Sequence, residues 1–335
     1  MFVGTTHQSF PETTPIACWP TEKLVFLPPP VPYRGMGIGD VTRVTVGDCT
    51  DLHYVDTGMY DTAEYGSVYL IDDERPAIVD SGIGTNYERI LAALEEVGID
   101  HDDLAAIVLT HVHLDHAGGA GFLAEACPNA TVYAPHNGAR HVTDPSRLVE
   151  GTKAAVGDQW RYYVEPKPVP EDRMEPYEDG DVIDLGTHEL RAHAAPGHAP
   201  HHFVFEDPAN DAVFTADGAG IWVPAIDEIR PTSPPPQFDL AQCLADVETI
   251  RDLDRSTLCF AHFGPRETGD VLDAYAETLS AWVESVREKR AELGADEAVI
   301  DHFADATDLD RVWGETKARG EVSMNVRGVL TSLDG

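Results

Sequence analysis

The feature that most constrains this chain is a run of three histidines and one aspartate within residues 110–116. It directly follows an apolar stretch, residues 105–109, whose Ile and Val predict a short buried strand. Small residues follow at 117–121, and residues 122–126 have the composition of a helix start. The pattern therefore predicts a loop between a strand and a helix that holds several metal-binding side chains together.

The spacing within this run suits two neighbouring metal ions. Neutral imidazole rings and a carboxylate are good ligands for zinc and similar divalent ions. His111 and His113 are two positions apart and can turn toward one point, while Asp115 and His116 turn toward a neighbouring point. Two adjacent cations need a shared anion between them, and a carboxylate and a hydroxide are the best candidates.

The run resembles the signature of the metallo-β-lactamase-fold hydrolases, and four other segments resemble that family in the same order. These segments are an early strand ending in an aspartate (78–82), a third-histidine segment (195–202), a strand ending in a bridging aspartate (213–218) and a last-histidine segment (260–265). The resemblance covers residues 45–265, about two-thirds of the chain. It implies an α/β fold, a four-layer αββα sandwich with a C-terminal helical extension.

Carried over position by position, the resemblance implies ligands for two divalent ions, with zinc expected and iron or manganese as alternatives. One ion would be held by His111, His113 and His198 and the other by Asp115, His116 and His262, with Asp217 as the bridge. Asp115 is also the expected catalytic residue, as a group that receives a proton. Asp80 and His202 stay open between a supporting role around the ligands and an ordinary structural one. Four histidines without ligand spacing are expected to be solvated or structural: His136, His141, His188 and His193.

The resemblance implies a hydrolase in which a metal-bridging hydroxide attacks a small ester, thioester or lactone and one metal polarises the carbonyl. The helical tail resembles the glyoxalase II-like branch, although its details do not match the glutathione-binding version. A first alternative is a persulfide-dioxygenase-like oxidoreductase with a single iron on His111, His198 and Asp217. A second is a nucleic-acid-processing or non-catalytic member of the fold, and the complete ligand set argues against a non-catalytic one.

The charge of the chain bears on its partners. It has 59 acidic and 23 basic residues, a formal net charge of −36, and the acids are spread along the chain. This distribution is typical of halophilic proteins, because salt near 1 M screens repulsion beyond about 3 Å. Blocks of acid would instead indicate a basic partner. Because no lysine or arginine cluster is present, we expect a small-molecule acyl substrate and no nucleic acid.

Cysteine usage and hydropathy predict the compartment. The five cysteines contain no CxxC pair, which predicts buried thiols in a reducing environment. No apolar run reaches 18 residues, and the first residues lack a charged segment followed by an apolar core. We therefore expect a cytoplasmic protein with no membrane association.

Three regions are expected along the chain. Residues 1–40 are rich in proline and predict an extended N-terminal arm, residues 41–265 a catalytic domain, and residues 266–335 a helical C-terminal extension. Residues 144–174 contain aromatic residues and then prolines. In the family that this chain resembles, the corresponding insertion covers the metal cleft, and core packing of these aromatics is the alternative.

Local patterns predict individual elements. Alternating apolar residues predict strands at 43–46 and 67–71, and an amphipathic pattern predicts a helix over Tyr87–Val97. A long helix is expected over residues 270–293, followed by two shorter ones. The last segment, residues 324–330, is apolar at helical spacing. It can pack on the core or on a partner chain, which leaves a homodimer as one arrangement.

Overall fold

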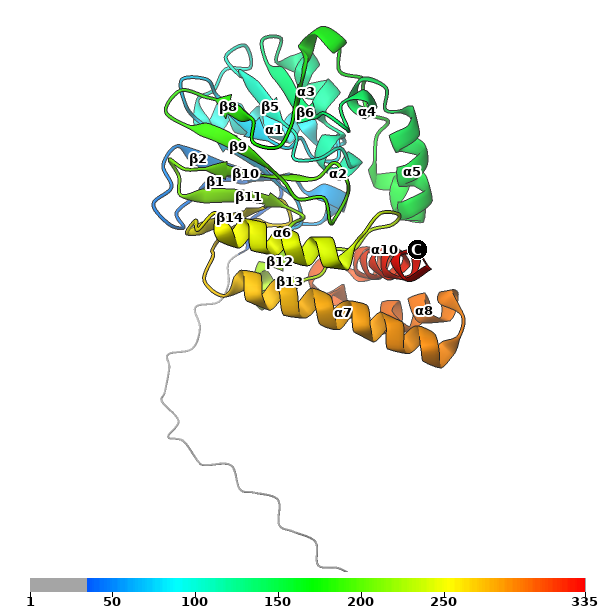
Figure 1. Ribbon diagram of the computed structural model, residues 1–335. Coiled ribbons are helices and arrows are strands. Elements are labelled where there is room, and N and C mark those ends of the chain that lie inside the picture. Colours follow the sequence, from blue (N-terminus) through cyan, green and yellow to red (C-terminus); the bar gives the residue numbers. More distant parts are fainter. Residues whose placement is uncertain (1–34, 335) are drawn as a thin grey trace, which may run out of the picture. The chain divides into compact units, whose positions relative to one another are not determined.

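The computed structural model describes residues 35–334. Within them, two β-sheets pack face to face and helices cover both outer sides (Figure 1). The predicted N-terminal arm, residues 1–40, lies almost wholly outside the described residues. The boundaries expected for the three regions of the chain stay predictions.

The first sheet has seven strands, and their order in the sheet is their order in the chain. The strands are β1 (Val41–Arg43), β2 (Leu52–Asp56), β3 (Ser67–Ile71), β4 (Ala77–Val79), β5 (Ala106–Val108), β6 (Thr131–Pro135) and β7 (Met174–Tyr177). Strands β1 to β4 pair antiparallel, and β4 to β7 pair parallel. Parallel neighbours need a crossover, which α1 (Tyr87–Val97) supplies between β4 and β5 and α3 (Ala120–Ala126) between β5 and β6.

The second sheet has six strands in the order β15-β14-β11-β10-β9-β8. They are β8 (Val182–Asp184), β9 (Glu189–Ala194), β10 (Phe203–Asp207), β11 (Ala212–Ala216), β14 (Thr257–Phe260) and β15 (Gly264–Glu267). Its one parallel pair, β11 with β14, is connected through α6 (Leu240–Asp252). A separate hairpin, β12 (Ile221–Val223) and β13 (Glu228–Arg230), lies in that connection.

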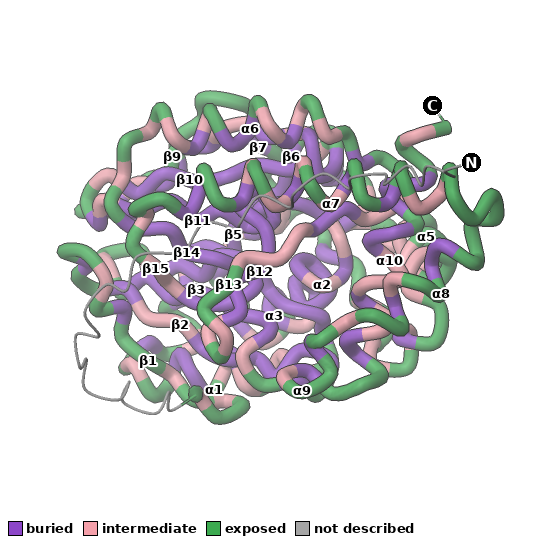
Figure 2. Tube along the Cα trace, turned by 90° about the horizontal axis from the view of Figure 1, so that it is seen from below, coloured by how far each residue is buried: buried purple, intermediate pink, exposed green. Residues whose placement is uncertain are grey.

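Alternation along the strands builds the layers. In β3, Val68 and Leu70 join the apolar cluster beneath α1 and α3, whereas Tyr69 and Ile71 join the cluster between the two sheets. Side chains of a strand point to opposite faces in turn, so each strand contributes to two cores. The central strands β3, β5, β10, β11 and β14 are buried throughout, the edge strands β1 and β8 are partly exposed, and the outer helix surfaces are exposed (Figure 2). The predicted four-layer αββα sandwich is confirmed.

Helix α1 begins and ends where the sequence pattern predicts. Ile90, Ala93 and Leu94 are buried at helical spacing, and the polar residues of the helix face outward. The helix ends at Gly98, whose φ of 90° lies in the left-handed region and whose N–H points back to the last carbonyls. Strand β3 also occupies its predicted residues.

The strand predicted at residues 43–46 was wrong in its position. The observed strand β1 ends at Arg43. The Val44 N–H still donates to the Leu52 carbonyl at 2.8 Å, but the chain then turns at Gly47, which has a φ of 63°. The alternation of apolar residues continues into this turn, and alternation alone does not show where the hydrogen-bond ladder of a strand ends.

The C-terminal extension is helical, as predicted. It contains α7 (Val271–Leu293), α8 (Asp296–Ala306), α9 (Asp310–Trp313) and α10 (Glu315–Asp334). The long first helix is confirmed, but the expectation of two shorter helices after it was wrong in number, because three follow within the described residues and the last of them, α10, has 20 residues. Val326, Val329 and Leu330 of α10 are buried in the same cluster as α7, so the apolar segment packs on the core of its own chain.

Predictions about the thiols can be checked for four cysteines. Cys49, Cys127, Cys243 and Cys259 are buried and free, as expected, while Cys18 lies outside the described residues. Burial raises the pKa of the Cys259 thiol well above its ordinary value. Among the helices of residues 35–334, none is both long and apolar enough to cross a bilayer. A cytoplasmic location stays a prediction.

Candidate metal centre

Four of the predicted ligands lie between the end of β5 and a short helix. His111 is in the loop, and His113 is the residue before α2 (Leu114–Ala117). Asp115 and His116 belong to that helix. The chain therefore turns from extended to helical within the run, which lets side chains two apart point to different places. The predicted strand is present as β5, but Asp115 and His116 lie on the short helix α2 and not on the predicted loop, and α3 begins at Ala120, inside the segment expected to be loop.

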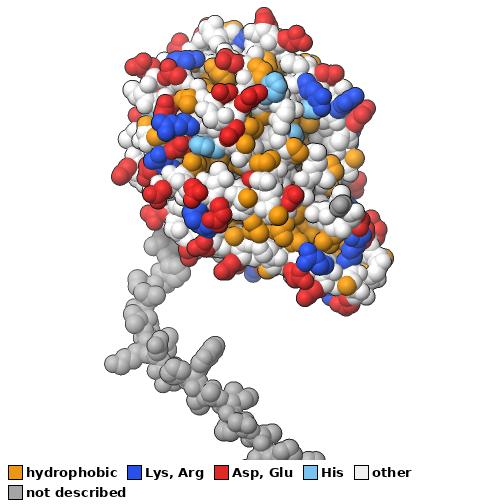
Figure 3. Space-filling view, in the orientation of Figure 1, with side chains coloured by type: hydrophobic (Ala, Val, Ile, Leu, Met, Phe, Trp, Pro, Cys, Tyr) orange, Lys and Arg blue, Asp and Glu red, His pale blue; other side chains and the backbone are white. Residues whose placement is uncertain are grey.

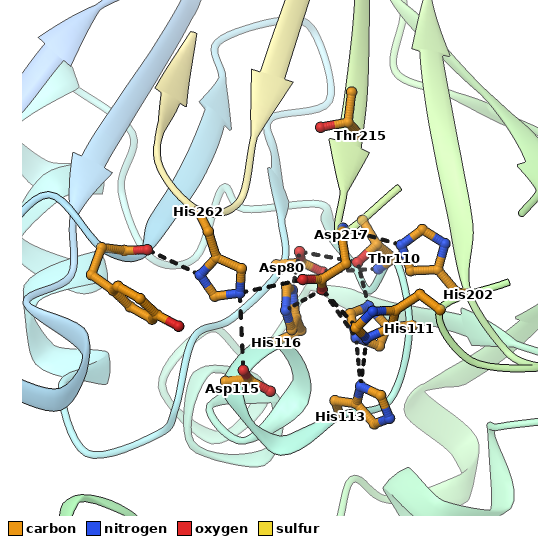
Figure 4. A network of polar contacts seen from close by, with 12 residues as sticks. Asp80, Thr110, His111, His113, Asp115, His116, His202, Thr215, Asp217 and His262 are labelled. Atoms are coloured by element: carbon orange, nitrogen blue, oxygen red, sulfur yellow. Dashed lines mark hydrogen bonds and ion pairs between the residues drawn. The ribbon is translucent and has the colours of Figure 1, made fainter. Parts of the chain in front are cut away.

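The other three predicted ligands come from the second sheet. His198 follows β9, Asp217 follows β11, and His262 follows β14. Asp217 points toward His116 and His262 toward Asp115, both on α2 (Figure 4). The site thus lies where loops from the edges of both sheets meet.

The first group contains the three histidines expected at one metal. The Nδ1 atom of His113 lies 3.0 Å from Nε2 of His111 and 3.0 Å from Nε2 of His198. The ligand atoms of all three rings lie within 4.8 Å of one another. Burial lowers the pKa of His111 and of His198 well below the ordinary value, which keeps both rings neutral. Neutral rings are the form that binds a metal ion.

The second group is next to the first, and one carboxylate contacts both. Asp115, His116 and His262 also have ligand atoms within 4.8 Å of one another. The Oδ2 atom of Asp217 is 3.0 Å from His116 Nε2 and 3.5 Å from His111 Nε2. Its Oδ1 atom is 3.7 Å from His262 Nε2. Asp217 therefore occupies the place that a bridging ligand requires.

These residues fit divalent cations. The Nε2 atom of His116 is buried and makes no hydrogen bond with the described residues, because its approach to Asp217 lacks hydrogen-bond geometry. A buried polar atom without a partner is costly unless something binds it. Around it, nitrogen and carboxylate donors from seven side chains converge, which is the donor set of zinc and similar ions.

Asp80 holds the loop and one of the rings. Its carboxylate accepts hydrogen bonds from the N–H and the hydroxyl of Thr110, at 2.8 and 2.9 Å, and from Nδ1 of His116 at 2.9 Å. The remaining nitrogen of His116 then points to the centre. A carboxylate that orients a ligating imidazole is a recurring feature around metals. The role left open for Asp80 is therefore a positioning one in this geometry.

His202 was also left open, and both its ring nitrogens are occupied. Its Nδ1 donates to the Ala195 carbonyl at 2.9 Å, and its Nε2 accepts the N–H of Asp217 at 3.2 Å. Burial lowers the pKa of His202 to about 4, consistent with a neutral ring in this tautomer. It lies close to His111 and Asp217, but it has no free lone pair for a metal. Its contact fixes the backbone of Asp217.

Comparison with known proteins agrees with this geometry. The family model described as the Metallo-beta-lactamase superfamily matches residues 61–262. That segment includes every predicted ligand from His111 to His262. The chain belongs to the metallo-beta-lactamase superfamily. The resemblance inferred from the sequence motifs is confirmed at the level of the superfamily.

Several members of the superfamily resemble this chain in more detail. The metallo-beta-lactamase fold-containing protein ST1585 of Sulfurisphaera tokodaii is 28% identical over 223 residues, which cover 64% of this chain and 79% of the relative. The crystal structure of ST1585 matches with a TM-score of 0.66 at 23% identity, covering 84% of this chain and 99% of that one. A hydroxyacylglutathione hydrolase of Bdellovibrio bacteriovorus is 30% identical over 117 residues, 34% of each chain.

Beyond the segment that matches the superfamily, α10 adds a buried ion pair that the sequence did not reveal. Lys317 Nζ lies 2.7 Å from Glu321 Oε2, and both residues are 3% exposed. The Tyr65 hydroxyl donates to Glu321 at 2.8 Å, and the Tyr65 carbonyl accepts from His262 Nδ1 at 3.0 Å. The ammonium also lies over the ring of Tyr60, 3.8 Å from its centroid. Opposite charges four apart on a helix usually mark an exposed pair, so the sequence carried no signal of burial.

A cavity of about 440 Å³ opens onto the centre. The ligands that line it are His113, Asp115, His198, Asp217 and His262. Another wall is formed by α4 (Arg140–Thr143), α5 (Ser146–Val156) and Tyr163. The insertion at residues 144–174 therefore lies over the metal cleft, as expected from the resemblance. The volume is in the range of small-molecule sites, about 300–1,000 Å³.

The remaining histidines have varied surroundings. His136 is exposed, His188 is buried 3.0 Å from an Asp207 carboxylate oxygen, and His193 lies 3.3 Å from Glu206. His141 and His201 line the cavity. The sequence did not distinguish His141 and His201 from the histidines outside the cavity, because they reach the cavity only through the packing of loops that are distant in the chain.

Proposed function

We propose that this protein is a metal-dependent hydrolase of a small ester, thioester or lactone that works with two divalent ions, zinc first among them. One observation carries the proposal. Two groups of ligand side chains meet at a single carboxylate, Asp217, and they open onto a cavity of small-molecule size. A hydrolase of this kind needs both features and no activated serine or cysteine.

When bound, the ions supply Lewis-acid chemistry that lowers the pKa of water toward about 7 and polarises a carbonyl. The other roles belong to side chains of the protein. Asp217 contacts both ligand groups. Asp80 orients the ring of His116, and His202 fixes the backbone of Asp217. Asp115, at 3.9 Å from His262 Nε2, is 23% exposed at its side chain and lines the cavity, where it receives the proton from the attacking water.

Relatives support an acyl substrate. Besides the hydroxyacylglutathione hydrolase, an acyl-coenzyme A thioesterase, MBLAC2 of Gallus gallus, is 27% identical over 183 residues, 62% of that protein. An atrochrysone carboxyl ACP thioesterase of Aspergillus fumigatus is 26% identical over 142 residues, 35% of that protein. These partial matches favour a thioester among the three substrate classes and are consistent with the glyoxalase II-like branch.

The iron alternative explains less of the site. A persulfide-dioxygenase-like centre on His111, His198 and Asp217 leaves the second group, whose side chains are equally well gathered, without a role. A polynucleotide substrate would have to approach an acidic surface. On the face drawn in Figure 3, red acidic side chains are spread widely among the basic ones. We therefore favour the hydrolase over the iron oxidoreductase and over a nucleic-acid-processing enzyme.

Metal analysis and a substrate panel test the proposal together. Protein purified in high salt is expected to contain two zinc ions per chain and to hydrolyse thioesters or lactones in preference to phosphodiesters. His136→Ala is a matched control, because this histidine is exposed and belongs to neither ligand group. One iron per chain with oxygen uptake on a persulfide, or a clear preference for phosphodiesters, would overturn the proposal.

Finer points belong to the same proposal. We propose a cytoplasmic protein with a salt-adapted surface, and the net charge of −36 and the spread of acids over the face drawn in Figure 3 support the salt adaptation. Its partner is a small-molecule acyl substrate, with no nucleic acid and no membrane. A homodimer would have to use another surface than Val326, Val329 and Leu330, which are buried in their own chain.

A further inference from the structure

Two arginines in the cavity wall have no acidic partner. Arg140 in α4 and Arg147 in α5 line the cavity, and no carboxylate of residues 35–334 forms an ion pair with either. Some exposed arginines of the described residues pair with carboxylates, as Arg251 does with Glu248 and Asp273, whereas others, such as Arg43 and Arg327, form no ion pair. What distinguishes Arg140 and Arg147 is their position, because both unpaired guanidinium groups line the cavity that the metal-ligand groups also line.

The positive charges of Arg140 and Arg147 both act on the ring of His141. Arg140 Nε donates to Nε2 of His141 at 3.2 Å. Burial, then the charges of Arg140 and Arg147, lower the pKa of His141, which is the effect of two cations close to the same ring. Asp144 is the nearby acid; hydrogen bonds from Ser146 are the main cause of its lowered pKa, and Arg147 adds to them without forming an ion pair.

The rest of this wall suits an organic ligand. Along α5, Leu148, Ala155 and Val156 line the same cavity as the metal-ligand groups. A ligand that spans the cavity therefore meets metal ligands, an apolar wall and two guanidinium groups. Guanidinium groups match carboxylates and phosphates with paired hydrogen bonds. The net charge of −36 repels anions in general, so a local cationic pair is what admits one.

We propose that the substrate is an acyl compound with a carboxylate or phosphate at its far end, and that Arg140 and Arg147 bind this anionic group. The inference rests on the proposed hydrolase function, because it places the acyl group at the metal ligands. It assigns the α4–α5 wall as a specificity site. Neither arginine is expected to take part in bond breaking.

Three thioesters with the same acyl group test the assignment on the metal-loaded protein. Butyryl-coenzyme A carries phosphates, S-butyrylglutathione carries carboxylates, and S-butyryl-N-acetylcysteamine is neutral. In Arg140→Gln and Arg147→Gln, kcat/KM for the matching anionic thioester is expected to fall about tenfold per arginine, mainly through KM. The neutral thioester should change less than twofold. The anionic thioester that responds identifies phosphate or carboxylate as the group bound.

The control is Arg287→Gln, which removes the same charge from an exposed pair with Glu284 on α7. It should leave all three thioesters unchanged. Added KCl should also raise KM for the anionic substrate in the unaltered protein relative to the double variant Arg140→Gln/Arg147→Gln, because salt screens the attraction by the two arginines while it screens the general repulsion by the chain in both proteins. An equal loss on neutral and anionic thioesters, or a preference of the unaltered protein for the neutral one, would overturn the assignment.

Failure of the hydrolase proposal would look different. If the unaltered protein hydrolyses none of the three thioesters, titration calorimetry with the same compounds still tests the anion site. Binding of the matching anionic thioester should then weaken about tenfold per arginine in the variants, while the neutral compound binds as before. Equal affinities of the unaltered protein and the double variant for both anionic thioesters would refute it.

Discussion

Replacing Lys317 by Met should destabilise the protein strongly, because it leaves a buried carboxylate without its cation. Glu321 is 3% exposed, and its oxygens would retain the hydrogen bonds from Tyr65 at 2.8 Å and from Asn325 at 2.8 Å. Burial works to raise the pKa of Glu321, but the Lys317 ammonium and the Tyr65 hydroxyl together hold it below its ordinary value. Without the Lys317 ammonium, the effect of burial is expected to dominate and to raise the pKa of Glu321 above its ordinary value.

The magnitude follows from burial. Breaking a buried ion pair on one side costs about 3–5 kcal/mol. The two remaining hydrogen bonds to Glu321 favour the lower end, while the lost contacts of Nζ with the rings of Tyr60 and Tyr65, at 3.8 and 3.9 Å, add to the cost. We therefore expect a loss of about 3–4 kcal/mol in the free energy of unfolding at pH 8. The double variant Lys317→Met/Glu321→Gln should recover most of it, because no unpaired charge remains.

Denaturant titrations of the metal-loaded protein in high salt measure this loss. In Lys317→Met the Glu321 carboxyl is expected to have a pKa above its ordinary value, so the loss is small at low pH and grows as pH rises through that raised pKa. The control Lys289→Met breaks an exposed pair with Glu292 and should cost far less. A loss below about 1 kcal/mol at pH 8, or no recovery in the double variant, would show that water reaches this pair.

Three further predictions concern the centre, the pH dependence and the salt dependence. Asp217→Asn should lower the affinity of both metal positions at least about tenfold, since one carboxylate serves both groups, and elemental analysis with unchanged metal content would contradict this. The hydrogen bond to Asp207 raises the pKa of His188, so its stabilisation is complete below the ordinary value and is lost as pH rises through the raised one. His188→Gln should therefore reduce the fall in unfolding free energy between pH 6 and 9, and an unchanged fall would rule out the pair as its source. Thermal melts should show Tm rising steeply with KCl, because screening at 1 M acts beyond about 3 Å, and a flat or falling curve would refute a salt-adapted surface.

The local part of this protein could be predicted from its sequence. Tyr87–Val97 is an amphipathic helix closed by a glycine, and its bounds follow from residues that are neighbours in the chain. The run at 110–116 likewise fixes the type and spacing of four candidate ligands on one loop. The segments of His198, Asp217 and His262 were found through the superfamily resemblance, and the structure brings all three to that loop. The sequence did not predict correctly where β1 ends or how many helices follow α7.

Only the tertiary structure decided what surrounds these ligands. Asp80 and His202 stayed open between a supporting and a structural role until their contacts with His116 and the Asp217 backbone were seen. Lys317 lies 252 positions after Tyr65, yet α10 brings it against that ring. Hydrophobic burial fixes where such elements dock, and it depends on surfaces assembled from the whole chain rather than on any local pattern. The ligands belong to short motifs that a sequence displays, whereas their hydrogen-bond partners, the cavity and its cationic wall exist only once distant segments have packed together.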